Sequence, residues 1–325
     1  MRISLGITTI VCLMASSLMT ASTHAVEPLR IGLIGLDSSH AVAFTKTINA
    51  SDASPELQNA KVVAAFPGGS PDLPTSADRI EGFTKQVSDM GIEIVPSIDA
   101  LLKKVDAVIM NSVDGRVHLQ QVKPVLEAGI PVFVDKPITA SLGDTKELIA
   151  LSKKTGTPFF SSSTLRFCKE VIDLNKEDVV GCVAYSPCKL DPTHPDLFWY
   201  GIHGVETLFT VMGPGCQTVQ RTQADGVEIV TGVWEDGRVG TFRGIRDGSA
   251  GYGVLVFGKK GIELTKIRAS YDLLVVEIVT FFRTKKAPVS PEQTLEIVAF
   301  MTAADMSRDA DGQAISMENL LIETK

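Results

Sequence analysis

One residue of the chain, Lys136, could carry acid–base chemistry. Lys136 lies in Asp135-Lys136-Pro137, directly after the apolar run Pro131–Val134. A lysine at the carboxyl end of a parallel strand faces the crevice where open α/β sheets bind ligands, and it can serve there as an acid or a base. Read alone, the same lysine is equally compatible with a solvated surface loop. A single histidine such as His203 is also more often structural than catalytic.

A glycine turn near the start of the chain could hold a phosphate. A strand-like apolar run ends at Gly35, and a segment with helical character follows, as at the start of a dinucleotide-binding unit. In the G-x-G-x-x-G register only Gly35 is retained, since Asp37 and His40 replace the second and third glycines. Either Ser38 and Ser39 still hold a phosphate, or Asp37 or Ser38 simply caps the first helix. The charge of Asp37 would repel a phosphate at close range.

The ribose-binding position of such a unit lacks its usual acid. The second strand, Lys61–Phe66, runs directly into Pro67-Gly68-Gly69-Ser70, and no carboxylate follows before Asp72. An acid at this point selects NAD, and an arginine nearby accommodates the additional phosphate of NADP. We find neither in the sequence, so both cofactors remain open.

The elements around these residues predict two domains. Short apolar strands alternate with helices from Leu29 to about residue 165, which is typical of a doubly wound, Rossmann-like parallel sheet. Strands and hairpin signals then dominate, including Asp236-Gly237 between Val227–Trp234 and Val239–Arg243, and two helices close the chain. We therefore expect a Rossmann-like domain over residues 26–165 and an α+β domain with a mostly antiparallel open sheet over residues 166–325.

The N-terminus and the composition suggest an exported globular protein. Residues 1–25 resemble a Sec-type signal peptide, with cleavage expected after Ala25, and an uncleaved anchor is the alternative. This implies a periplasmic or extracellular protein with no stable membrane span after cleavage. The net charge of −7 and the lack of basic clusters argue against nucleic acid. Four cysteines remain, Cys168, Cys182, Cys188 and Cys216, and both disulfides and buried free thiols are open.

Several motifs in order resemble the Gfo/Idh/MocA family of oxidoreductases over most of residues 29–310. The matching pieces are Ile31–Gly35, Asn111-Ser112-Val113, His118, Gly129-x-Pro-Val, Asp135-Lys136-Pro137, Leu165-Arg166-Phe167 and His203-Gly204-Val205-Glu206. The resemblance implies an NAD(P)-binding domain and a second domain whose open sheet mediates homo-oligomers. It also implies hydride transfer on a sugar or cyclitol.

By the same resemblance, site residues can be assigned. The catalytic residues are Lys136, His203 and Tyr200; the cofactor-binding residues are Gly35, Asp37, Ser38, Ser39, Asn111, Ser112, Val113, Asp135 and Lys136; no metal is expected. One departure stands out, because Trp199 occupies the position four residues before the histidine where the family often has an aspartate. The polar loop with Asp191, His194 and Asp196 is too sparse to predict a metal site.

Two observations argue against ordinary use of a nicotinamide cofactor and leave other functions open. The phosphate turn is incomplete, and a Sec-type route exports an unfolded chain into a compartment where free NAD should be scarce. The leading hypothesis is an oxidoreductase that uses NAD or NADP on a small-molecule carbohydrate. The alternatives are a non-redox carbohydrate-binding protein, or a lyase or hydrolase, that uses the same scaffold without any dinucleotide.

Overall fold

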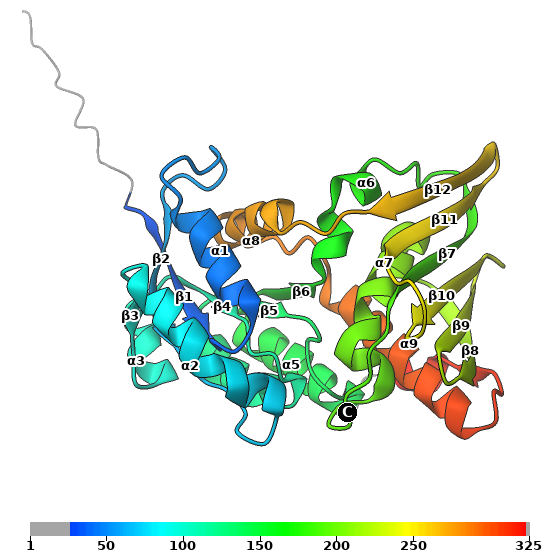
Figure 1. Ribbon diagram of the computed structural model, residues 1–325, viewed down its shortest axis with the longest axis horizontal. Helices are drawn as coiled ribbons and strands as arrows, with labels where there is room; N and C mark the ends of the chain where they lie inside the picture. The colour runs from blue at the N-terminus through cyan, green and yellow to red at the C-terminus, as the bar shows by residue number, and fades with distance from the viewer. Residues whose placement is uncertain (1–26, 323–325) are drawn as a thin grey trace, which may run out of the picture.

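The computed structural model describes residues 27–322 and contains two sheets with helices packed around and between them (Figure 1). The expected signal peptide lies outside the described residues. The first sheet has six parallel strands in the order β3-β2-β1-β4-β5-β6. These strands are β1 (Leu29–Ile34), β2 (Ala60–Phe66), β3 (Glu93–Ile94), β4 (Ala107–Met110), β5 (Val132–Asp135) and β6 (Phe159–Ser162). Apolar residues form most of β4 and β5, which are buried along their whole length because helices cover both faces of the sheet.

The strand order reverses between β1 and β4, and this is the point where open α/β sheets bind ligands. The helices of this domain are α1 (Ser39–Asn49), α2 (Pro74–Asp89), α3 (Ile98–Leu102), α4 (His118–Glu127) and α5 (Leu142–Thr155). Both ends of α5 are capped: Ser141 accepts a hydrogen bond from the Asp144 amide, and Gly156 ends the helix with a left-handed conformation. The expected Rossmann-like sheet is therefore present.

The second sheet has seven strands in the order β12-β11-β7-β10-β9-β8-β13. They are β7 (Val179–Pro187), β8 (Cys216–Ala224), β9 (Val227–Trp234), β10 (Val239–Ile245), β11 (Tyr252–Gly258), β12 (Gly261–Ile267) and β13 (Ile315–Ser316). All neighbours are antiparallel except β7 and β10, so the expected mostly antiparallel sheet is confirmed. The sequence analysis did not predict β8, because the strand is rich in glutamine and threonine and one of its buried positions is occupied by Arg221.

Two helices cover the face of the second sheet that is turned toward the first domain (Figure 1). They are α7 (Ile202–Met212), which packs on β7, and α9 (Pro291–Asp309), which packs on β8. Gly204 permits the close approach of α7, since a Cβ there would lie 2.2 Å from a ring carbon of Phe242. The short helices α6 (Lys169–Ile172) and α10 (Glu318–Leu321) lie before the first strand and after the last strand of this sheet.

One helix from the C-terminal half returns to the first domain. Helix α8 (Asp272–Thr284) belongs to the same hydrophobic cluster as β1 and α1, and the ring of Phe281 lies 5.0 Å from that of Phe160 on β6. The connection from β12 to α8 therefore carries Tyr271 across the cleft between the two domains. The four cysteines within the described residues are buried and free. Between residues 27 and 322, no helix combines the length and apolarity needed to cross a bilayer.

Candidate active site

A cavity of about 470 Å³ lies between the two domains, at the carboxyl ends of β1, β4 and β5. Lys136, His203 and Tyr200, which were assigned catalytic roles from sequence, all line it, as do Ser38, Ser39 and Val113. The remaining lining residues are His40, Thr75, Arg79, Thr164, Leu165, Lys189, Trp199, Tyr252, Ala269 and Tyr271. The other assigned residues, Gly35, Asp37, Asn111, Ser112 and Asp135, lie behind this wall and do not line the cavity.

The glycine turn has the geometry of a phosphate-binding turn. Gly35 has a φ of +86°, and a Cβ on it would lie 2.3 Å from the Ser112 nitrogen, so no other residue fits there. Ser38 is the N-cap of α1, because its hydroxyl accepts a hydrogen bond from the His40 amide at 3.2 Å. The start of α1 thus faces the cavity with Ser38 and Ser39, and a helix start is favourable for an anion.

Asp37 is turned away from the cavity. Its side chain is fully buried, and its two oxygens accept hydrogen bonds from the Ser76 hydroxyl at 2.6 Å and from the Val113 amide at 3.0 Å. Burial raises the pKa of this carboxyl above its usual value, although both hydrogen bonds oppose the change. Asp37 therefore ties the β1–α1 turn to the start of α2 and to the loop after β4. It is neither the cap of α1 nor part of the surface that a phosphate would meet.

His40 and Asp135 form a pair beneath the cavity floor. The Nδ1 atom of His40 bonds to one oxygen of Asp135, and the other oxygen accepts a hydrogen bond from the Lys136 amide at 2.8 Å. Burial acts to raise the pKa of Asp135, but attraction to His40 and then to Lys136 outweighs it, so the pKa is lowered. The His40 ring packs between Phe44 and Tyr271, with centroids 5.3 and 4.7 Å away. From the sequence, His40 was noted only as the residue in place of the third glycine, and its pairing with Asp135 was not predicted.

Tyr200 and His203 form the opposite wall with Tyr252. The Lys136 ammonium lies 5.8 Å from the centre of the Tyr200 ring, and that ring lies 5.0 Å from the ring of His203. The Tyr200 and Tyr252 hydroxyls are 3.1 Å apart. His203 is held by the Ser163 hydroxyl, 2.8 Å from Nδ1, which leaves Nε2 without a protein partner among the described residues.

The electrostatic environment keeps His203 neutral. Burial first, and then the positive charge of Lys136 and the nearby His40, lower the pKa of His203 well below its usual value. A neutral imidazole can accept a proton at neutral pH. His203 is placed by α7, and the next turn of that helix carries Glu206. Glu206 is buried, and it accepts hydrogen bonds from Arg166 at 2.7 Å and from the Ser162 hydroxyl at 2.8 Å.

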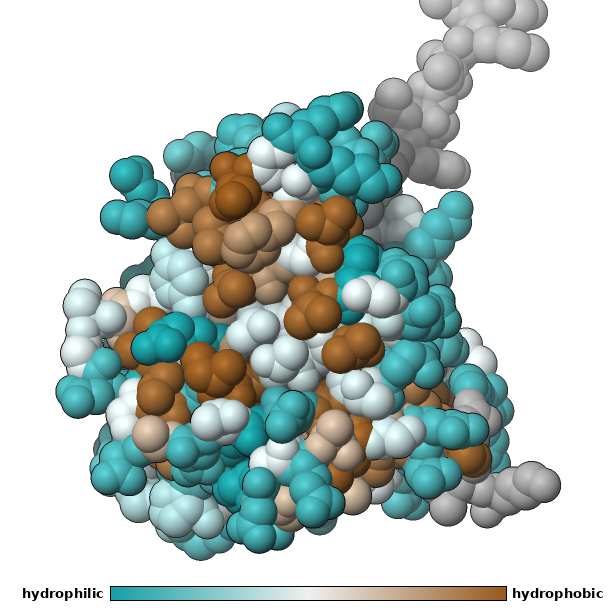
Figure 2. Space-filling view, turned by 90° about the vertical axis from the view of Figure 1, so that its right-hand side faces the viewer, coloured by the Kyte–Doolittle hydropathy of each residue, from teal (hydrophilic) through white to brown (hydrophobic). Residues whose placement is uncertain are grey.

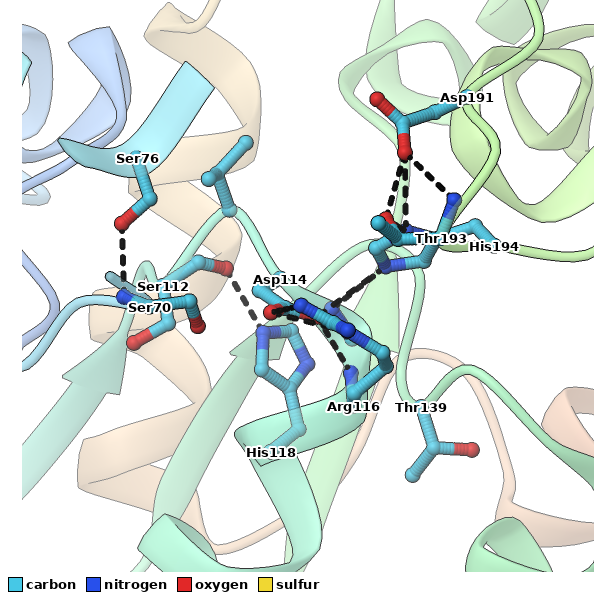
Figure 3. Close-up of polar contacts among 12 residues, drawn as sticks. Ser70, Ser76, Ser112, Asp114, Arg116, His118, Thr139, Asp191, Thr193 and His194 are labelled. Carbon is cyan, nitrogen blue, oxygen red and sulfur yellow. Dashed lines mark hydrogen bonds and ion pairs between the residues drawn. The ribbon is translucent and has the colours of Figure 1, made fainter. Parts of the chain in front are cut away.

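The polar loop before α7 joins the two domains (Figure 3). The Nε2 atom of His194 accepts a hydrogen bond from the Gly115 amide at 3.1 Å and lies 3.3 Å from Asp114, which is fully buried. Asp114 is also paired with Arg116 at 2.7 Å, while Asp191 holds the neighbouring Thr193. This loop contributes a contact between the domains, and no group of three or more metal-ligating side chains exists within residues 27–322.

Two side chains on the far side of the cavity were missed from sequence. Thr75 and Arg79, on α2, line the cavity on the same side as Ser38 and Ser39. Their i, i+4 spacing on the helix after β2 places both on one face, and this spacing is the signal that could have identified them. Arg79 forms no ion pair with any other described residue, so its charge is available to a ligand.

The residues present fit a dinucleotide. Gly35 lets the β1–α1 turn lie close against Ser112, the start of α1 is open to the cavity, and the side-chain amide of Asn111, at the end of β4, is fully buried with both polar atoms unpaired among the described residues. The carboxylate that usually binds the adenine ribose is missing after β2, and the helix that follows this strand, α2, places Arg79 in the cavity lining.

Comparison with known proteins supports this interpretation of the N-terminal domain. Residues 29–163 match the family model described as "Oxidoreductase family, NAD-binding Rossmann fold". No curated protein sequence matches the chain. Among solved structures, the fold is similar to scyllo-inositol dehydrogenase from Lactobacillus casei with bound NAD(H) and scyllo-inositol, with a TM-score of 0.71, 16% identity and coverage of 90% of this chain and 99% of that one.

A second solved structure, GenD2 from gentamicin A biosynthesis in complex with NAD, has a TM-score of 0.71 and 16% identity, and the match covers 90% of this chain and 97% of that one. Identities this low show the shared fold alone. The family match rests on residues 29–163, which hold the glycine turn, Asn111 and Asp135-Lys136-Pro137. Through these residues, the N-terminal domain matches the Gfo/Idh/MocA family of oxidoreductases, over less than half of the chain.

Proposed function

We propose that the protein is a nicotinamide-dependent oxidoreductase that interconverts a hydroxyl and a carbonyl on a sugar or cyclitol. The observation that carries this proposal is the meeting of Lys136, Tyr200 and His203 in one cavity with the open start of α1. The relatives with solved structures include an inositol dehydrogenase with NAD(H) and its polyol bound.

The residues of the cavity provide the proton chemistry of this reaction. When bound, the nicotinamide accepts the hydride that leaves the substrate carbon. In the tautomer whose Nδ1–H donates to Ser163, the free Nε2 of His203 accepts the hydroxyl proton. The Lys136 ammonium stabilises the negative charge that develops on the oxygen, and the Tyr200 hydroxyl can donate a hydrogen bond to the same atom.

Turnover of polyols tests the proposal. Purified protein is incubated with a panel of sugars and cyclitols and with oxidised NAD or NADP, and the absorbance of the reduced nicotinamide is followed. We expect turnover with at least one polyol and a loss of about 10²–10⁴-fold in kcat for His203→Ala and for Lys136→Met, with unchanged thermal unfolding. Equal turnover by the variants would contradict the assignment.

The finer choice of cofactor is also a proposal, and Arg79 supports NADP(H). The support is that Arg79 and Thr75 lie on α2, the helix after the strand whose ribose-binding acid is missing, and that a guanidinium suits the additional phosphate of NADP. Arg79→Ala should weaken NADPH binding about 10- to 100-fold and leave NADH binding unchanged. Equal losses for the two nucleotides would contradict this choice. Lys85→Ala, at an exposed position later on α2, is the matched control.

Export and oligomerisation remain proposals too. Residues 1–25 have the pattern of a Sec-type signal, and N-terminal sequencing of the protein from a periplasmic fraction would test cleavage after Ala25.

For oligomerisation, the support is the outer face of the second sheet, where apolar side chains gather (Figure 2). The exposed members are Val180, Val233, Val239, Ile262 and Leu264. The molar mass measured by light scattering should be that of a dimer or a larger oligomer. The double variant Ile262→Lys, Leu264→Lys should have a molar mass closer to that of the monomer.

A second candidate function is favoured by one observation, the His40–Asp135 pair. A histidine oriented by a carboxylate next to the cavity could act as an additional base in a lyase or hydrolase that needs no nicotinamide. Turnover of a polyol or glycoside in protein freed of nucleotide would support this candidate, and strict dependence on added nucleotide would exclude it.

A further inference from the structure

The charges that line the cavity do not match those of the chain as a whole. The protein has 38 acidic and 31 basic residues and a net charge of −7. The cavity nevertheless has three cationic side chains, Arg79, Lys136 and Lys189, and no aspartate or glutamate among its lining residues. A concave site lined by one sign of charge concentrates ligands of the opposite sign.

Among the cavity cations, Lys136 is partly compensated by a neighbouring carboxylate, because Asp135 attracts it while also bonding to His40. Asp191, two residues after Lys189, accepts hydrogen bonds from the amide and the hydroxyl of Thr193 and forms no ion pair with Lys189. Among the described residues, no carboxylate forms an ion pair with Arg79 or Lys189, so these two charges are free to meet a ligand.

Asp196, further along the same loop, is bonded elsewhere too. It is paired with Arg221 at 2.8 Å and also with Arg308. Within the described part of the chain, Lys189 itself has no ion pair. Its ammonium group thus has no protein anion to neutralise it.

The three cations lie on different walls of the cavity, so they cannot all serve one group. Arg79 lies beside the start of α1, where the phosphates of a dinucleotide belong. Lys136 follows β5 and is engaged with the reacting oxygen in the proposed function. Lys189 follows β7 and so lies on the wall of the second domain, the wall that also carries Trp199 and Tyr200. A bound cofactor leaves the charge of Lys189 uncompensated.

The remaining groups on that wall suit a polyol. Aromatic faces are presented by Trp199, Tyr200 and Tyr252, and they can contact the C–H faces of a sugar ring. The hydroxyl groups of the two tyrosines can bond to the hydroxyls of the sugar. Trp199 is also held in place, because its ring packs 4.9 Å from that of His194. A ligand that uses the aromatic groups and also Lys189 combines a polyol with an anionic group.

We propose that the substrate is an anionic polyol, a sugar or cyclitol that carries a carboxylate or a phosphate, and that Lys189 binds this group. The inference rests on the proposed function in one respect, because it takes this cavity as the substrate site. It goes further in naming the charge of the substrate and the residue that selects it.

Matched ligand pairs test the inference. Binding to the purified full chain is measured by calorimetry for glucuronate, galacturonate, gluconate and glucose 6-phosphate, each against its uncharged parent glucose, galactose or glucitol. We expect at least one anion to bind at least about tenfold more tightly than its parent. The carboxylate and phosphate arms show which anionic group is preferred. If no anion in the panel binds more tightly than its parent, the inference is overturned.

Variants test whether the preference for an anion comes from Lys189 itself or from the overall positive charge of the cavity. Lys189→Gln should remove the preference for the anion and leave the affinity for the neutral parent, the binding of NADPH and the thermal unfolding unchanged. Lys169→Gln, at an exposed lysine on α6, should leave the preference intact. A preference that survives in Lys189→Gln would overturn the assignment.

The same measurements distinguish this inference from the proposed function. Each titration is done with and without NADPH, whose own binding is read by its fluorescence. Selective binding of an anion without any nucleotide binding would refute the oxidoreductase and leave the anionic site. Nucleotide-dependent turnover of a neutral polyol without any anion preference would refute the anionic site and leave the oxidoreductase.

Discussion

Replacing Lys136 by methionine should raise the proton affinity of His203, because the ammonium is one of the charges that keep this imidazole neutral. Lys136 Nζ lies 5.8 Å from the Tyr200 ring centre, and that centre lies 5.0 Å from the His203 ring, so the two cationic sites are no farther apart than these distances together. With an effective dielectric constant of about 20, two unit charges within that separation repel by about 1.5 kcal/mol or more. Loss of the ammonium should therefore strengthen proton binding at His203 by about tenfold.

The assay is a pH titration of the histidine ring resonances by NMR, which needs no catalytic activity. In the native protein, His203 should titrate well below the usual range, since burial is the main cause of its lowered pKa. In Lys136→Met the pKa should rise but remain below the usual value, because burial persists. Lys85→Met, at an exposed lysine, is the control and should have no effect.

Protein stability should follow the same titration. The folded protein holds His203 neutral, whereas the unfolded chain binds a proton near pH 6.5, so the unfolded state gains protons as the pH falls below about 6.5. His203 should therefore contribute a loss of stability on acidification below that pH and none above it. A native His203 that titrates at its usual pH, or a titration unchanged in Lys136→Met, would refute this account of the site.

Two other substitutions test the floor of the cavity. Asp37→Ala leaves the Ser76 hydroxyl and the Val113 amide without their buried acceptor and should lower the free energy of unfolding by about 2–5 kcal/mol in urea denaturation; Asp37→Asn should cost less, and a loss below about 1 kcal/mol for Asp37→Ala would contradict the role of these bonds. Asp135→Ala leaves the His40 ring and the Lys136 amide without their buried partner and should also lower the free energy of unfolding in urea, while an unchanged free energy would contradict the role of this pair.

Strand and helix periodicity predicted the two sheets and most of their elements from sequence, because burial follows the local pattern of apolar residues. Periodicity does not report which non-adjacent segments meet. The return of α8 to the first domain is one such case, since Phe281 of α8 contacts Phe160 of β6 within a shared hydrophobic cluster although the two are far apart in the chain. Strand β8 was not predicted, because it is rich in glutamine and threonine and one of its buried positions is occupied by Arg221.

The candidate site was predictable where it depends on strand ends and not where it depends on side-chain direction. Lys136 was placed correctly in a cleft, because parallel strands end at one edge of a sheet. For Asp37, the sequence showed a charge in a phosphate turn, but not that the carboxyl turns inward to Ser76. Arg79 was not predicted, because the search for a ribose-binding residue looked only at the residues directly after β2. Arg79 lies further along the chain, on α2, and reaches the cavity because it is one helical turn after Thr75.

Nucleotide binding tests the central claim most directly, because every function that uses hydride transfer requires it. The purified full chain is first denatured and assayed for released nucleotide, and the refolded or nucleotide-free protein is then titrated by calorimetry with NAD⁺, NADH, NADP⁺ and NADPH. We predict binding of one dinucleotide per chain, with NADPH preferred and with His203 not required. Absence of released nucleotide together with no binding at millimolar concentrations would contradict the oxidoreductase assignment.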